Sequence, residues 1–139
     1  MLVPSFSFTM KITNLILRIV LALILLMPIG GALGFFPEPT AEMYSTTESW
    51  EFIFALMQTG YMMPLISVCF ALSAILLFTG HQALSALILL PLTVNVVAFH
   101  WFLDATPISA ASSLAYVLLV LNLYLLWYNR QRYEGLLKG

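Results

Sequence analysis

The residues best suited to chemistry lie near the end of one apolar stretch. His100 and Asp104 are four positions apart, so on a helix they share a face, and Thr93 lies two turns earlier on the same stripe. An aspartate one turn from a histidine can fix the imidazole tautomer and raise its pKa. This spacing predicts a proton relay or an orienting hydrogen bond, and Asn95 is a further candidate for contact with a ligand.

A simpler interpretation also stays open, in which Asp104 ends the helix while His100 and Trp101 anchor it at the membrane interface. A metal site is not predicted. His100 and Asp104 supply only two ligands, and the other histidine, His81, precedes this apolar stretch and is expected at its opposite end. Cys69 is the only cysteine, which excludes an intramolecular disulfide or a Cys-x-x-Cys pair. No catalytic residue is assigned.

A second polar pair is expected at the other end of the chain's apolar stretches. Arg18 lies about six residues inside the first stretch, and Asn122 lies about six residues from the end of the last, so their depths are similar. We predict that Arg18 contacts Asn122 and tail groups such as Glu134. The alternative is that Arg18 extends alone to the interface, as long basic side chains do.

Such residues require a membrane fold to position them. The 139 residues are 62% hydrophobic and 8% charged, with a mean hydropathy of +1.01, whereas soluble domains have about 25% charged residues. A helix needs about 20 apolar residues to cross a bilayer. We predict one all-α membrane domain over residues 1–139, an antiparallel bundle of four transmembrane helices, with spans at 12–33, 61–78, 83–103 and 107–128.

The connections support this layout. Gly80 suits the left-handed residue that closes a helix, and Thr106 before Pro107 is typical of a helix start. The long connection, residues 34–60, contains the capping-box pattern of Ser45 and Glu48. Apolar residues then recur at helical spacing, which predicts a short amphipathic helix on the outer surface of the membrane.

The basic residues set the expected orientation. All five flank or enter the first span from its N-terminal side, or follow the last span, and they are Lys11, Arg18, Arg130, Arg132 and Lys138. The positive-inside rule therefore places both termini in the cytoplasm. A net charge of −1 gives no reason to expect nucleic-acid binding.

Three stretches resemble the DoxX-like family of small four-helix membrane proteins. They are Leu15-Ile16-Leu17-Arg18-Ile19, the segment Thr59-Gly60-Tyr61-Met62-Met63-Pro64-Leu65, and the run from Asn95 to His100 and Asp104. The chain departs from the family pattern at residues 67–70, which carry no charge where many relatives have an acidic residue. That difference puts in doubt any ligand or redox chemistry that the acid supports in relatives.

The resemblance implies a protein of the bacterial inner membrane, because the family is associated with membrane oxidoreductase systems and with partner complexes. We expect a non-catalytic subunit or accessory factor of a larger membrane complex, in contact with membrane lipids and with a protein partner. The alternative is a quinone- or lipid-binding component of an oxidoreductase system, which would use Asn95, His100 and Asp104. No resident cofactor is identified, and quinone is the candidate ligand.

Overall fold

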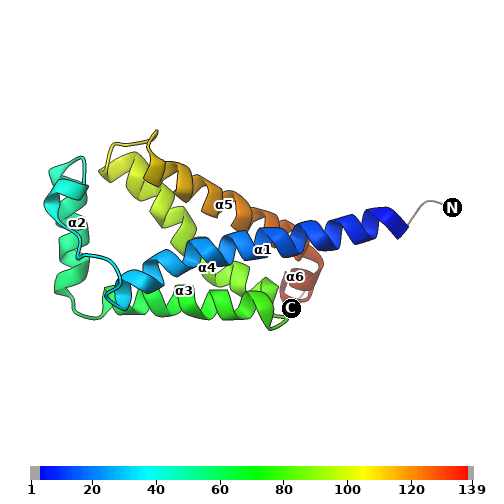
Figure 1. The fold of residues 1–139 in the computed structure, drawn as a ribbon. Helices are drawn as coiled ribbons and strands as arrows, with labels where there is room; N and C mark the ends of the chain where they lie inside the picture. Colours follow the sequence, from blue (N-terminus) through cyan, green and yellow to red (C-terminus); the bar gives the residue numbers. More distant parts are fainter. Residues whose placement is uncertain (1–3, 138–139) are drawn as a thin grey trace.

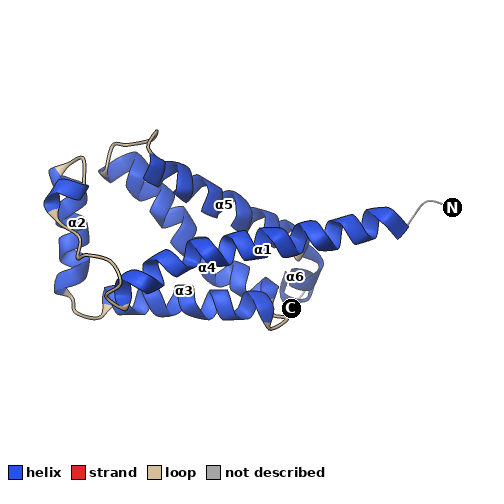
Figure 2. Ribbon diagram, in the orientation of Figure 1, coloured by secondary structure: helices blue, strands red, loops and turns tan. Residues whose placement is uncertain are grey.

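The computed structural model describes residues 4–137, and within this range every regular element is a helix (Figure 2). The elements in chain order are α1 (Pro4–Ala32), η1 (Ala41–Met43), α2 (Thr47–Gln58), α3 (Met62–Phe78), α4 (Gln82–Ala98), η2 (Phe99–Leu103), α5 (Ala110–Tyr128) and α6 (Arg130–Leu137). The prediction of an all-α protein is confirmed over the described residues.

Three helical segments of this range are long and apolar enough to cross a membrane. They are Met10–Ala32, Gln82–Leu103 and Ala110–Tyr128, close to three of the predicted spans. The segment predicted as a fourth span forms α3, a helix of 17 residues, and the preceding α2 is bent from it by 87°. The chain therefore has the composition and helix lengths of an integral membrane protein.

The four long helices pack into a bundle. α3 packs against α1 and α4, α4 packs against α5, and α1 also contacts α5, while α2 crosses one end of the bundle (Figure 1). The shared core is apolar and comes from all four long helices: Leu21, Leu25, Phe70, Leu77, Ala86, Leu89, Leu118, Leu121 and Leu125. The tight turn between α3 and α4 contains Gly80 at φ +83°, a backbone conformation that favours glycine, as predicted.

The first helix is longer than predicted and extends beyond its neighbours. It begins at Pro4 rather than near residue 12, and its N-terminal part projects past the ends of α3 and α5 (Figure 1). Asn14 donates a hydrogen bond to Gln82 Oε1 at 3.2 Å, so residue 14 is level with the first residue of α4. Residues 1–3 lie outside the described range.

Two helix starts differ from the prediction. α2 is capped by Thr46, whose hydroxyl accepts from the Ser49 amide, and not by Ser45. The reason is that the Ser45 amide is bound by a side chain from another part of the chain, described below. α5 begins at Ala110 with Ser109 and Ser112 forming the capping box, so the start predicted at Thr106 is wrong.

Candidate functional site

The strongest polar cluster lies where η2 meets the start of α2. η2 is a π-helical turn, and its widened geometry is closed by the Asp104 amide, which donates to the Phe99 carbonyl at 2.9 Å. Such turns inside helices are frequent at functional sites. Here the turn directs the Asp104 side chain toward residues 45–49, and the chain then reverses through Ala105 at φ 51°.

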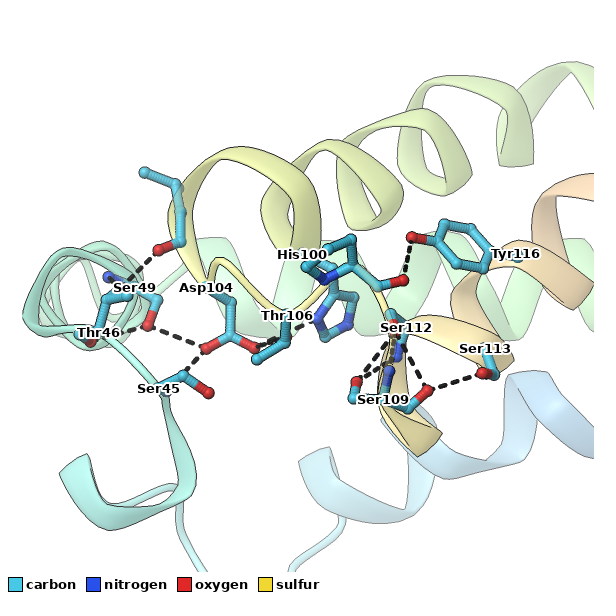
Figure 3. Close-up of polar contacts among 12 residues, drawn as sticks. Ser45, Thr46, Ser49, His100, Asp104, Thr106, Ser109, Ser112, Ser113 and Tyr116 are labelled. Atoms are coloured by element: carbon cyan, nitrogen blue, oxygen red, sulfur yellow. Dashed lines mark hydrogen bonds and ion pairs between the residues drawn. The ribbon is translucent and has the colours of Figure 1, made fainter.

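The Asp104 carboxylate joins three segments of the chain. Its Oδ1 accepts from the Ser45 amide at 2.9 Å and from the Ser49 hydroxyl at 3.2 Å. Its Oδ2 accepts from the Thr106 hydroxyl at 2.5 Å and lies 3.4 Å from His100 Nδ1. Figure 3 shows the carboxylate between these partners. A carboxylate has about four acceptor positions, so hydrogen bonds from its own chain fill three of them, and His100 lies next to the fourth.

These contacts fix the charge of the carboxylate. Burial raises the pKa of Asp104, but the hydrogen bonds from Thr106, Ser45 and Ser49 and the contact with His100 lower it by more, so the net pKa lies below its ordinary value. Asp104 is 7% exposed and enclosed mainly by its own hydrogen-bond partners. It is therefore ionised at neutral pH and unsuited to act as an acid there.

His100 and Asp104 are in contact, as their spacing predicts. The 3.4 Å separation is an electrostatic contact rather than a well-directed hydrogen bond, because His100 Nδ1 is buried without a hydrogen-bond partner among the described residues. The imidazole also packs edge-on against Phe99, with ring centroids 5.4 Å apart. The pair is thus confirmed as a contact, and its chemistry stays a prediction.

The other two residues predicted for this site lie elsewhere. Thr93 is fully buried in the bundle and donates to the Leu90 carbonyl at 3.0 Å. Asn95 is exposed and borders a hollow of about 170 Å³ beside Phe52 and Phe102. Thr93 was predicted on one stripe with His100, but the π-turn of η2 rotates the residues after Ala98 relative to those before it, so Thr93 lies in the bundle while His100 lies beside Asp104.

Thr93 meets Asn122 instead, inside the bundle. The Asn122 carboxamide bridges two backbone groups of α4: its Oδ1 accepts from the Leu90 amide and its Nδ2 donates to the Ala86 carbonyl, both at 3.1 Å. With the amide reversed, Nδ2 donates to the Thr93 hydroxyl at 3.3 Å, but the first orientation satisfies both ends. The bridge lies just before Pro91, where α4 lacks a backbone donor.

Arg18 does not reach Asn122, so the predicted pairing is wrong. Its Nη2 donates to the Leu77 carbonyl at the end of α3, and its guanidinium lies over the Phe78 ring, 5.1 Å from the centroid. The prediction counted depth from the ends of the apolar stretches. Since α1 extends past the bundle, Arg18 is level with the end of α3 and well away from the buried Asn122.

Sequence reasoning missed Ser45, Thr46 and Ser49, which complete the cluster around Asp104. The Thr46 hydroxyl donates to the Leu103 carbonyl and accepts from the Ser49 amide. It therefore satisfies one backbone acceptor at the end of η2 and one backbone donor at the start of α2. The sequence does show several hydroxyl side chains close together at positions 45–49. This pattern was interpreted only as a helix start and not as a set of partners for a distant carboxylate. Within the described residues, no group of three or more candidate ligands could hold a metal ion.

No protein-family model, no curated protein and no solved structure matches this chain.

Proposed function

We propose that this chain is a DoxX-like protein of the bacterial inner membrane that acts as a non-catalytic subunit or accessory factor of a larger membrane complex. The observation that carries the proposal is the set of hydrogen bonds on Asp104, which come from Ser45, Ser49 and Thr106 of its own chain. The residues that could have formed an acid–base site therefore hold α2 against the bundle. We call residues 41–58 the cap.

The dimensions of α3 support a fourth crossing. Its 17 residues rise about 26 Å at 1.5 Å each, close to the hydrocarbon thickness of about 30 Å. It lies between α1 and α4, which are both long enough to span. With four crossings, α2 lies across the membrane surface at one end, as its 87° bend from α3 favours.

The charges favour cytoplasmic termini. Lys11 lies toward the N-terminal end of α1, and Arg18 is near the middle of α1 but level with the end of α3. Arg130 and Arg132 lie on α6, at the opposite end of the bundle from the cap (Figure 1). The cap and its loops carry acidic residues instead, among them Glu42, Glu48 and Glu51. Basic residues are retained on the cytoplasmic side, so the cap faces the outer side.

The space beside the cluster supports a role without a substrate. The hollow next to Asn95 has about 170 Å³ and is bordered mainly by aromatic side chains, whereas sites for small ligands have about 300–1,000 Å³. Asp104 lies behind its hydrogen-bond partners. A substrate would have to displace Ser45 or Thr106 to reach the carboxylate.

Exposed apolar residues at the cap end support a protein partner. Ile108 is 95% exposed and lies in the loop before α5, and Phe102 is 83% exposed and lies in η2, at the end of the spanning segment Gln82–Leu103. We call these two residues the outer rim. Side chains of this size are typical anchors in protein interfaces, and they lie beside the segment that Asp104 holds in place.

The experiment is extraction in native-membrane nanoparticles followed by intact-complex mass spectrometry. We expect the 15.5 kDa chain in a stoichiometric complex with one other protein, and we expect Ile108→Ser with Phe102→Ser to release that protein. The matched control is Val120→Ser, an exposed apolar residue in the middle of α5. A chain that is free of partners in the native membrane, or a complex that both variants keep intact, would refute the proposal.

The second candidate is a quinone- or lipid-binding component that uses His100 and Asn95. The observation that favours it is the buried, unpartnered Nδ1 of His100. A quinone retained by the wild-type protein and lost in His100→Ala, with the partner complex intact, would support it. If no quinone is retained by the wild type, this candidate fails independently of the first.

A further inference from the structure

An open groove runs along the membrane-facing side of the bundle between α1 and α3. It has about 430 Å³ and is lined by apolar side chains, including Ile19 and Leu26 from α1 and Phe78 from α3. Two alanines, Ala22 and Ala74, open it, because larger residues at these positions would fill the space between the helices. The groove extends about 10 Å along α1, from Ile19 to Leu26 at 1.5 Å per residue.

A partly exposed cation stands at one end of this groove. Arg18 precedes Ile19 on α1, and its guanidinium lies over the ring of Phe78, which itself lines the groove. Only the Leu77 carbonyl accepts from Arg18 in residues 4–137, and Nε is without a hydrogen-bond partner there. Guanidinium has five donors. One binds the Leu77 carbonyl and the buried Nε is enclosed, so three donors on the two terminal nitrogens remain for an acceptor from outside the chain.

The position of Arg18 along the bundle matches the level of lipid head groups. Leu77 belongs to the last turn of α3, and Arg132 from α6 donates to the Gly80 carbonyl in the next turn at 3.2 Å. Two arginines thus converge where α3 ends. No carboxylate forms an ion pair with Arg18 in the part of the chain that the structure describes. The positive charge is therefore not neutralised locally by those residues.

We propose that this groove is a binding site for one anionic phospholipid, with an acyl chain against Ala22 and Ala74 and the phosphate on Arg18. Guanidinium forms charge-assisted, often bidentate hydrogen bonds with phosphate, and basic pockets between membrane helices bind anionic head groups. The site is separate from the cap and independent of the accessory role. It requires only that the chain spans a membrane.

The test uses the full-length protein in detergent, with phosphatidylglycerol or phosphatidylcholine of identical acyl chains added, and native mass spectrometry as the readout. We expect one retained phosphatidylglycerol per chain and a preference over phosphatidylcholine of about 5-fold or more, since one basic residue near the surface contributes that factor. Arg18→Gln should remove the preference. Arg130→Gln is the matched control, because Arg130 is exposed and lies over Trp127 away from the groove.

A second variant changes the shape of the groove and leaves the charge of Arg18 intact. Ala74→Phe fills the groove, so we expect it to abolish retention of both lipids, whereas Val120→Phe, on the exposed face of α5, should retain them as the wild type does. Equal retention of the two lipids by the wild type would overturn the proposal. So would an unchanged preference in Arg18→Gln, full retention in Ala74→Phe, or a lipid-free dimer that Ala74→Phe dissociates.

Discussion

Removal of the Asp104 carboxylate should detach the cap while leaving the bundle folded. In Asp104→Ala, the Ser45 amide loses its acceptor, and this is the main loss. The Ser49 hydroxyl still donates to the Thr46 carbonyl at 2.8 Å, and Thr46 still donates to the Leu103 carbonyl. The perturbation is therefore confined to a few hydrogen bonds between residues 45–49 and the end of η2.

The expected magnitude follows from the type of bond. A hydrogen bond to a charged group contributes about 1.5–3 kcal/mol, so loss of the charged acceptor for Ser45, with a smaller loss at Ser49, should weaken the cap contact by about 2–3 kcal/mol. At about 1.4 kcal/mol per factor of ten, this equals a roughly 30- to 100-fold increase in cap opening. Asp104→Asn keeps an oxygen for the Ser45 amide and should increase opening by only about 5-fold.

Hydrogen–deuterium exchange of the protein in lipid nanodiscs measures this opening directly. The amides of residues 45–58 should lose protection by the stated factors, while those of α4 and α5 keep theirs. Glu51→Gln is the control, because Glu51 is an exposed carboxylate on the same helix. The reasoning fails if Asp104→Ala leaves residues 45–58 protected to within threefold of the wild type. It fails equally if protection falls uniformly across the bundle, since the carboxylate would then stabilise the whole fold.

Three further predictions follow from other contacts. The pKa of Asp104 is lower in the folded chain than its ordinary value of 3.8, so its contribution is complete above that value and lost as the pH falls through the lower folded value. The protection factors of the cap amides, which correct for the pH dependence of intrinsic exchange, should therefore be constant from pH 7 to about 4 and fall below it, and Asp104→Asn should remove that fall. Asn122→Leu should reduce the free energy of unfolding in bicelles by about 1 kcal/mol, the range for buried polar contacts in membranes, and no change would contradict the backbone bridge to Ala86 and Leu90. Gly80→Ala should lower the melting temperature through a cost of about 1–2 kcal/mol at its positive φ, whereas Gly31→Ala, inside α1 with open space around it, should leave it unchanged or raise it.

The positions of the helices could be predicted because they depend mainly on local properties of the sequence. The length of each apolar stretch has to match the thickness of the bilayer. Three of the spans, the short amphipathic helix and the turn at Gly80 follow from composition and spacing. Helix ends were less predictable, because they depend on distant contacts. Ser45 would make an acceptable cap by sequence, but its amide is bound by Asp104, 59 residues away, and the cap moves to Thr46.

Only the part of the candidate site that lies within one helical turn could be predicted from the sequence. His100 and Asp104 meet because residues four apart share a face, even across the π-turn. Thr93 was misplaced relative to His100, because the π-turn that separates them leaves no clear signal in a single sequence. Arg18 was misplaced because its depth depends on how far α1 extends beyond its neighbours, and this is a tertiary property.

Polar residues inside the bilayer are usually candidates for function, but in this chain several of them satisfy its own backbone. Ser85 donates to the Ser73 carbonyl at 2.8 Å, Asn122 bridges two groups of α4, and Arg18 donates to the last turn of α3. Backbone groups in lipid must find partners within the protein, and these side chains supply them. The exceptions among the described residues are four buried atoms without a hydrogen-bond partner, namely Asn14 Oδ1, Arg18 Nε, Ser73 Oγ and His100 Nδ1. Two of these atoms belong to Arg18 beside the groove and to His100 near the outer rim, so the function is to be sought at these two places.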